Sequence, residues 1–190
     1  MNPSGEESGG IRLDKFQREA IEYLDKGMSV MVSAPTGSGK TQVALHAIRI
    51  ALSNNKRAFY TTPLKALSNQ KFGELRQLFG VESVGLLTGD IAVNSDAPIV
   101  VMTTEILRNM IYERSDCLDE LSHVVVDEVH YLQNPYRGGI WEEVIIHTPG
   151  EVIMVCLSAT VSNAEEFGEW LRTVREGVGV VVETLRPVKL

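Results

Sequence analysis

Short apolar runs alternate along the chain with longer stretches in which apolar residues recur at helical spacing. The apolar runs are rich in Val and Ile, and several lack the strict alternation of a strand that is exposed on one face. Strands of that kind are typical of parallel sheets that helices cover on both sides. The runs predicted to be strands are residues 28–34, 57–61, 83–87, 99–103, 123–127, 152–158 and 178–183.

The intervening stretches predict helices. Val43, Ala44, Ala47, Ile48 and Ala51 fall on one helical face, and further helices are predicted over residues 64–79, 105–113 and 164–172. Alternating strands and helices favour an α/β fold in which a mostly parallel sheet has helices on both faces. The 190 residues suffice for one such domain, expected over residues 11–190. The polar, Gly-rich residues 1–10 are expected to form a flexible leader.

Composition narrows the functional classes only slightly. The formal net charge of −7 argues against a simple basic nucleic-acid-binding module, because such modules bind mainly by neutralising phosphates. Cys117 and Cys156 form no paired-cysteine motif, which favours a reducing, cytoplasmic location over a disulfide framework or a zinc site. No apolar run approaches the roughly 20 residues that span a bilayer, so no membrane segment is expected.

A glycine-rich turn follows the first predicted strand and precedes a predicted helix. It reads Ala-Pro-Thr-Gly-Ser-Gly-Lys-Thr from Ala34 to Thr41. Gly37 and Gly39 allow the backbone to curl so that successive N–H groups point at phosphate oxygens. Lys40 is placed to reach the β- and γ-phosphates, and the Thr41 hydroxyl is placed to bind Mg²⁺. The residues predicted to bind ATP in this P-loop are Thr36, Gly37, Ser38, Gly39, Lys40 and Thr41.

Two carboxylates follow a later strand. Asp127 and Glu128 come directly after an apolar run, at the strand end where open α/β sheets bind ligands. Asp127 is predicted to complete the Mg²⁺ shell, and Glu128 to orient or deprotonate the attacking water. Together with Lys40 they form a predicted catalytic set that uses ATP and Mg²⁺.

At this point the chain resembles a known family. Asp127-Glu128-Val129-His130 resembles the DExH box of superfamily 2 helicases, and other motifs of that family occur in the same order. These are Phe16-Gln17, Thr62-Pro63-Leu64-Lys65-Ala66-Leu67, Thr88-Gly89-Asp90, Thr103-Thr104-Glu105 and Ser158-Ala159-Thr160. The stretch from Arg137 to Glu143 is similar to the RGxxWEE stretch of Ski2-like RNA helicases, and residues 60–71 are similar to actinobacterial members.

The resemblance covers residues 11–190 and implies roles for individual residues. Gln17 is expected to read adenine, and His130 to couple the ATP site to Ser158 and Thr160. A nucleic-acid strand would be held by its phosphates. The residues implied for that contact are Pro63, Lys65, Thr88, Gly89 and Thr104. Trp141, Trp170 and Tyr60 are predicted to be packing residues.

The resemblance also implies a function, although other functions remain as alternatives. The chain is expected to be the first of two RecA-like P-loop domains in an ATP-dependent RNA helicase that acts on single-stranded RNA. The second RecA-like domain would supply an arginine finger, so the isolated domain is expected to be a monomer that is nearly inactive. The alternatives are a DNA-repair helicase of the same superfamily, a P-loop kinase or nucleotide switch without translocation, and a non-catalytic nucleic-acid-binding module.

Overall fold

The computed structural model describes residues 12–129 and 138–185. It contains an eight-stranded sheet of order β4-β3-β5-β2-β6-β7-β1-β8. Neighbouring strands are parallel except for β3 and β4, which are antiparallel. The strands are β1 (Ser29–Ser33), β2 (Arg57–Thr62), β3 (Val84–Leu87), β4 (Ala92–Val93), β5 (Ile99–Thr103), β6 (Leu121–Val126), β7 (Ile153–Ser158) and β8 (Val178–Val182).

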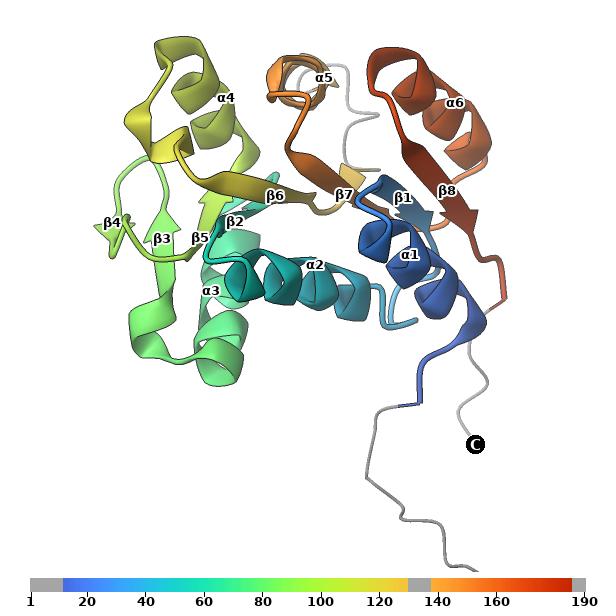
Figure 1. Cartoon of the computed structure of the whole chain (residues 1–190), viewed down its shortest axis with the longest axis horizontal. Coiled ribbons are helices and arrows are strands. Elements are labelled where there is room, and N and C mark those ends of the chain that lie inside the picture. The colour runs from blue at the N-terminus through green and yellow to red at the C-terminus, as the bar shows by residue number, and fades with distance from the viewer. Residues whose placement is uncertain (1–11, 130–137, 186–190) are drawn as a thin grey trace, which may run out of the picture.

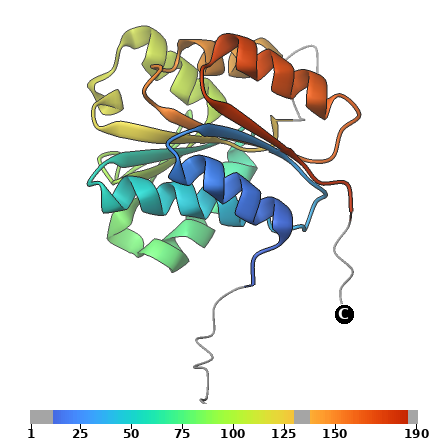
Figure 2. The ribbon, with the colours of Figure 1, turned by 45° about the vertical axis from the view of Figure 1, so that its right-hand side comes forward.

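Helices cover both faces of the sheet (Figure 1; Figure 2). Those on one face are α1 (Lys15–Asp25), α2 (Thr41–Ser53) and α3 (Lys65–Phe79), and those on the other are α4 (Thr104–Glu113), α5 (Gly138–His147) and α6 (Ala164–Val174). Two short 3₁₀ turns, η1 (Val81–Ser83) and η2 (Asp116–Leu118), precede β3 and β6. The result is a three-layer α/β domain, as the alternating pattern predicted.

Each face of the sheet has its own apolar core. Successive residues of a strand point to opposite faces, so Val125 belongs to the core beneath α1, α2 and α3, while Val124 and Val126 belong to the other. Trp141 is 8% exposed and packs edge-on against Trp170, with ring centroids 5.4 Å apart. The prediction that both tryptophans are packing residues is therefore confirmed.

All seven predicted strands are present, with ends shifted by at most two residues. The sequence did not predict the two-residue β4, α1 or α5. Because the strands of the parallel part all run the same way, the ends of β1, β2, β5, β6 and β7 meet at one edge of the sheet. That carboxyl edge carries the candidate site. Within the described residues, no helix is both long and apolar enough to cross a bilayer.

Candidate nucleotide and nucleic-acid site

The P-loop joins β1 to α2 with a backbone that only glycine adopts easily. Gly37 and Gly39 have φ values of 81° and 84°, in the left-handed region. The Lys40 ammonium donates to the carbonyl oxygens of Ala34 at 2.6 Å and Pro35 at 3.1 Å. Burial lowers the pKa of Lys40, while the nearby negative charges of Glu128 and Asp127 oppose that shift. The lysine is thus held within the loop, close to both carboxylates.

Gln17 ties α1 to the P-loop. Its side-chain oxygen accepts from the Asp14 N–H at 2.7 Å, and its amide nitrogen donates to the Gly39 carbonyl at 2.9 Å. A Cβ at Gly39 would lie 2.6 Å from that nitrogen, so the close approach requires glycine. Gln17 is 5% exposed and both ends of its amide are engaged within the chain. Pairing with adenine, the role implied by resemblance, would require these bonds to be released.

The capping of α1 is a feature that the sequence reading missed. Asp14 and Gln17 form a reciprocal capping box at the start of the helix. An Asp followed three positions later by Gln is a recognisable signature of that box. The same Gln17 therefore begins the helix and supports the phosphate loop.

The two carboxylates lie at the end of β6, opposite the P-loop. Asp127 Oδ1 accepts from the Glu128 N–H at 2.8 Å, and Asp127 Oδ2 accepts from the Tyr60 hydroxyl at 2.5 Å. Glu128 has a φ of 58°, a strained conformation for a residue with a side chain and one that concentrates at functional sites. Burial, followed by the charge and hydrogen bond of Asp127, raises the pKa of Tyr60 well above its usual value. Tyr60 is a core residue, as predicted, but the sequence did not predict its contact with Asp127.

These elements border one cleft of about 370 Å³. It brings together Thr36, Gly37, Gly39, Lys40, Thr41, Asp127 and Glu128. Ser38 and Gln17 are buried behind the loop instead. Leu67, Gln70 and Lys71 of α3 also line the cleft, although the sequence assigned none of them to it.

The oxygen donors fit Mg²⁺. In the two described segments, no three His, Cys, Asp or Glu side chains converge on one point that could hold a metal. Mg²⁺ is commonly held by one or two carboxylates, with water and substrate phosphates completing the shell. Asp127 and the Thr41 hydroxyl, both lining the cleft, supply that incomplete set of ligands.

The residues implied for nucleic acid lie further along the same edge. Lys65 forms an exposed ion pair with Asp90 at 2.5 Å, and the Thr88 hydroxyl donates to Asp90 at 3.1 Å. The hydrogen bond from Lys65 is the main reason that the pKa of Asp90 is lowered. Thr88 is 7% exposed and Thr104 is 6% exposed. Lys65 and Gly89 are exposed and Pro63 is half-buried, so the surface offers fewer hydroxyls than the motifs suggest.

Two of the three residues implied in coupling can be placed. Ser158 is buried and its hydroxyl donates to the Ala159 carbonyl at 2.8 Å, while Thr160 is exposed. The Ser158 carbonyl accepts from the Ala34 N–H at 3.1 Å, which joins the end of β7 to the P-loop. His130 lies outside the described residues, as does Arg137.

Known proteins are similar to this chain in sequence. A sequence profile described as DEAD/DEAH box helicase matches residues 14–167. The chain is 57% identical over 178 residues to the "Probable helicase HelY" of Mycobacterium leprae, with 94% of the chain and 19% of the relative covered. It is 52% identical to "DExH-box ATP-dependent RNA helicase DExH15 chloroplastic" of Arabidopsis thaliana, covering 95% and 16%. It is 46% identical to "Antiviral helicase SKI2" of Saccharomyces cerevisiae, covering 99% and 15%.

The fold has a solved counterpart. The crystal structure of the DUF1998 helicase MrfA bound to DNA superposes with a TM-score of 0.77 over 93% of this chain and 28% of that one, at 23% sequence identity. The chain spans a fifth or less of the curated relatives named above. The likeness to HelY and SKI2 confirms the resemblance to Ski2-like helicases. With a profile match that covers most of its length, the chain belongs to the DEAD/DEAH box helicase family.

Proposed function

We propose that this chain is the ATP-binding motor domain of an ATP-dependent RNA helicase, which couples ATP hydrolysis to movement along and unwinding of RNA. The observation that carries the proposal is the cleft in which Lys40 and Thr41 face Asp127 and Glu128. A nucleotide switch needs no catalytic carboxylate beside the metal ligand, and a purely binding module needs neither. Cys117 and Cys156 are both free thiols, which is compatible with a cytoplasmic location.

Each residue has a distinct task in the proposed reaction. Lys40 neutralises the terminal phosphates, and Gly37 and Gly39 let the loop amides turn toward them. Thr41 and Asp127 would hold Mg²⁺, which would offset negative charge on the phosphates of the nucleotide. Glu128 accepts the proton of the attacking water. An arginine from a second RecA-like domain would contribute about 10³–10⁵ in rate, so the isolated chain should hydrolyse ATP little.

RNA is the proposed nucleic acid. One relative at 52% identity carries "RNA helicase" in its name, and Trp141-Glu142-Glu143 belongs to the stretch that resembles Ski2-like RNA helicases. We assign the phosphate contacts to the exposed Lys65 and Gly89, with Pro63, Thr88 and Thr104 shaping the surface beneath. DNA is the competing substrate, and a binding competition between matched strands distinguishes the two.

The test begins with nucleotide binding. Lys40→Ala should weaken Mg²⁺-dependent binding of a fluorescent ATP analogue roughly tenfold or more, because a charge-assisted contact of about 1.5–3 kcal/mol is lost. Lys26→Ala removes the same charge from an exposed position at the end of α1 and should leave binding unchanged. Equal affinity of the Lys40 and Lys26 variants would refute the assignment.

A second experiment compares RNA with DNA. When a uridine oligomer and a matched thymidine oligomer compete for binding to the chain at low salt, the uridine oligomer should bind more tightly; the reverse order would favour a DNA helicase.

A further inference from the structure

Tyr60 connects the apolar core to the nucleotide cleft. It lies in β2 beside Val125 of β6 and is 0% exposed. Its ring belongs to the core beneath α1, α2 and α3, whereas the neighbouring Phe59 belongs to the core on the opposite face. Because the ring is enclosed, the position of its hydroxyl is fixed by the sheet. That hydroxyl reaches the end of β6 and donates to Asp127 Oδ2 at 2.5 Å.

Both oxygens of the Asp127 carboxylate therefore accept from neutral donors of the chain. Oδ1 accepts from the Glu128 N–H at 2.8 Å, and Oδ2 from Tyr60. A carboxylate oxygen has two acceptor sites, so each oxygen keeps one for a hydrated cation. Two donors on different elements also prevent the carboxylate from rotating. Lys40, the nearest cation of the P-loop, donates instead to Ala34 and Pro35, and so does not compete for Asp127.

Packing alone does not require the hydroxyl. Phenylalanine would fill the same space, as Phe59 does one residue earlier in the same strand. On the side of the cleft the Tyr60 ring faces the Lys71 ammonium, 5.9 Å from its centroid, and Lys71 is paired with Glu74 at 2.8 Å. The only polar side chain that the hydroxyl contacts among the described residues is Asp127.

We propose that Tyr60 is a positioning residue that holds the Asp127 carboxylate ready for Mg²⁺ and so sets the metal requirement of the nucleotide site. The inference rests on the proposed ATP-binding function. It gives a side chain of β2 a part in the metal site, whose proposed ligands Thr41 and Asp127 lie at the start of α2 and directly after β6. Groups that hold a metal-binding carboxylate from behind change metal affinity about 10–100-fold when they are removed.

The experiment compares two hydroxyl deletions in one strand. Tyr60→Phe removes the donor to Asp127 and keeps the ring. Thr61→Val removes another buried hydroxyl of β2, which donates to the Val125 carbonyl of β6 at 3.0 Å and does not contact the carboxylate. Each variant loses one hydrogen bond from β2, to Val125 of β6 or to Asp127 directly after it, so their stabilities should fall together. The readout is the Mg²⁺ concentration that gives half-maximal binding of a fluorescent ATP analogue to the chain.

Tyr60→Phe should raise that Mg²⁺ concentration roughly tenfold, while Thr61→Val should match the wild type. Combined with Asp127→Asn, the Phe substitution should add no further effect, because the two residues act through one contact. Equal Mg²⁺ requirements of the Phe and Val variants, or full additivity with Asp127→Asn, would overturn the inference alone. Absence of any Mg²⁺-dependent nucleotide binding by the wild type would overturn the proposed function, and this inference with it.

Discussion

The two edges of the sheet use polar side chains in opposite ways. At the carboxyl edge, Lys40, Asp127 and Glu128 border a cleft of about 370 Å³. At the amino edge, Arg57 and Arg175 bind main-chain carbonyls of the loops that lead into neighbouring strands. The charged groups of the first set border an open cleft, whereas these two arginines are hydrogen-bonded within the chain.

Arg175 illustrates the amino edge. It precedes β8, is 8% exposed, and donates to the carbonyls of Ile145, Thr148, Pro149 and Val152 at 2.6–3.2 Å. Those carbonyls belong to the end of α5 and to the turn that enters β7. A helix end leaves carbonyls without partners, and a buried guanidinium supplies several donors at once.

The difference shows where function can reside in this fold. Ligands bind at the carboxyl ends of parallel strands, so polar groups at that edge must remain available. At the amino edge Arg175 is buried, and a buried polar group needs hydrogen-bond partners within the chain. Substitutions at the carboxyl edge should therefore change binding and turnover, and substitutions at the amino edge should change stability.

The largest expected effect is on hydrolysis. Glu128→Gln, measured in a helicase that carries both RecA-like domains, should keep ATP binding and lower turnover roughly 10²–10⁴-fold, because an amide cannot accept the proton of water. Glu120 makes a matched control, since it precedes β6 at the amino edge and has a φ of 63° against 58° for Glu128. Glu120→Gln should leave turnover near wild type. Comparable losses in both variants would mean that the glutamate at the carboxyl edge is not the base.

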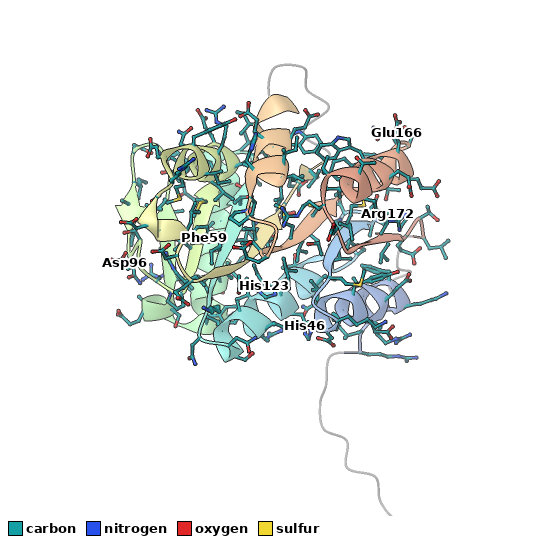
Figure 3. All side chains as sticks on the ribbon, turned by 45° about the horizontal axis from the view of Figure 1, so that its top comes forward. His46, Phe59, Asp96, His123, Glu166 and Arg172 are labelled. Carbon is teal, nitrogen blue, oxygen red and sulfur yellow. The ribbon has the colours of Figure 1, made fainter. Side chains whose placement is uncertain are left out.

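The next effect is on stability. Arg175→Met keeps the length of the side chain and removes its donors, leaving buried carbonyls without partners. We expect the free energy of unfolding to fall by about 3 kcal/mol, while nucleotide affinity is retained wherever the variant is folded. Arg172→Met removes an arginine of α6 (Figure 3) that is half-exposed and paired with Glu169, and it should cost far less. If folded Arg175→Met bound nucleotide more weakly, the amino edge would affect binding as well as stability, contrary to this comparison.

A third effect depends on pH and concerns His123, near the start of β6. His123 is 3% exposed, and burial, reinforced by the charge of His46 on α2 (Figure 3), lowers its pKa from 6.5 to about 4. Between these values the unfolded chain binds more protons than the folded chain. The stability is therefore complete above pH 6.5, and about 2 kcal/mol of it should be lost by pH 5.

Urea unfolding at pH 7.5 and pH 5 measures this dependence. His123→Leu should remove most of it, because the leucine side chain does not titrate. His147→Leu, at an exposed position of α5, should preserve it. If His123→Leu retained the full loss between the two pH values, other groups would be responsible for it.

The sequence predicted the sheet and most of the cleft, because both depend on local patterns. Apolar runs predicted the seven strands. The P-loop and the DExH box are each a short run of consecutive residues, so each can be recognised in the sequence. The contact of Tyr60 with Asp127 could not be predicted, since it depends on the register between β2 and β6. The two arginines of the amino edge were missed for a different reason, because their partners are main-chain carbonyls, which carry no sequence signal. The helix α5 was missed because its first residues, Gly138 and Gly139, are typical of a turn.

The smallest effect tests whether an ion pair at the carboxyl edge can be replaced by a contact with nucleic acid. Lys65 is paired with Asp90, and their side chains are 47% and 63% exposed, so water screens the pair. Nucleic-acid phosphate must compete with Asp90 for the ammonium. Asp90→Asn keeps an acceptor for the Thr88 hydroxyl and should raise affinity for a uridine oligomer about two- to threefold in about 0.1 M salt, without changing the melting temperature.

The control separates this local effect from net charge. Asp96→Asn adds the same charge at an exposed position before β5, at the margin of the molecule (Figure 3), where no phosphate is expected. It should leave affinity close to wild type, because long-range attraction is screened within about 10 Å at 0.1 M salt. If the two substitutions raised affinity equally, the gain would come from overall charge, and Asp90 would not compete with phosphate for the Lys65 ammonium. If neither substitution raised affinity, Lys65 would not exchange Asp90 for phosphate, and the ion pair would serve only the folded chain, as the arginine contacts of the amino edge do.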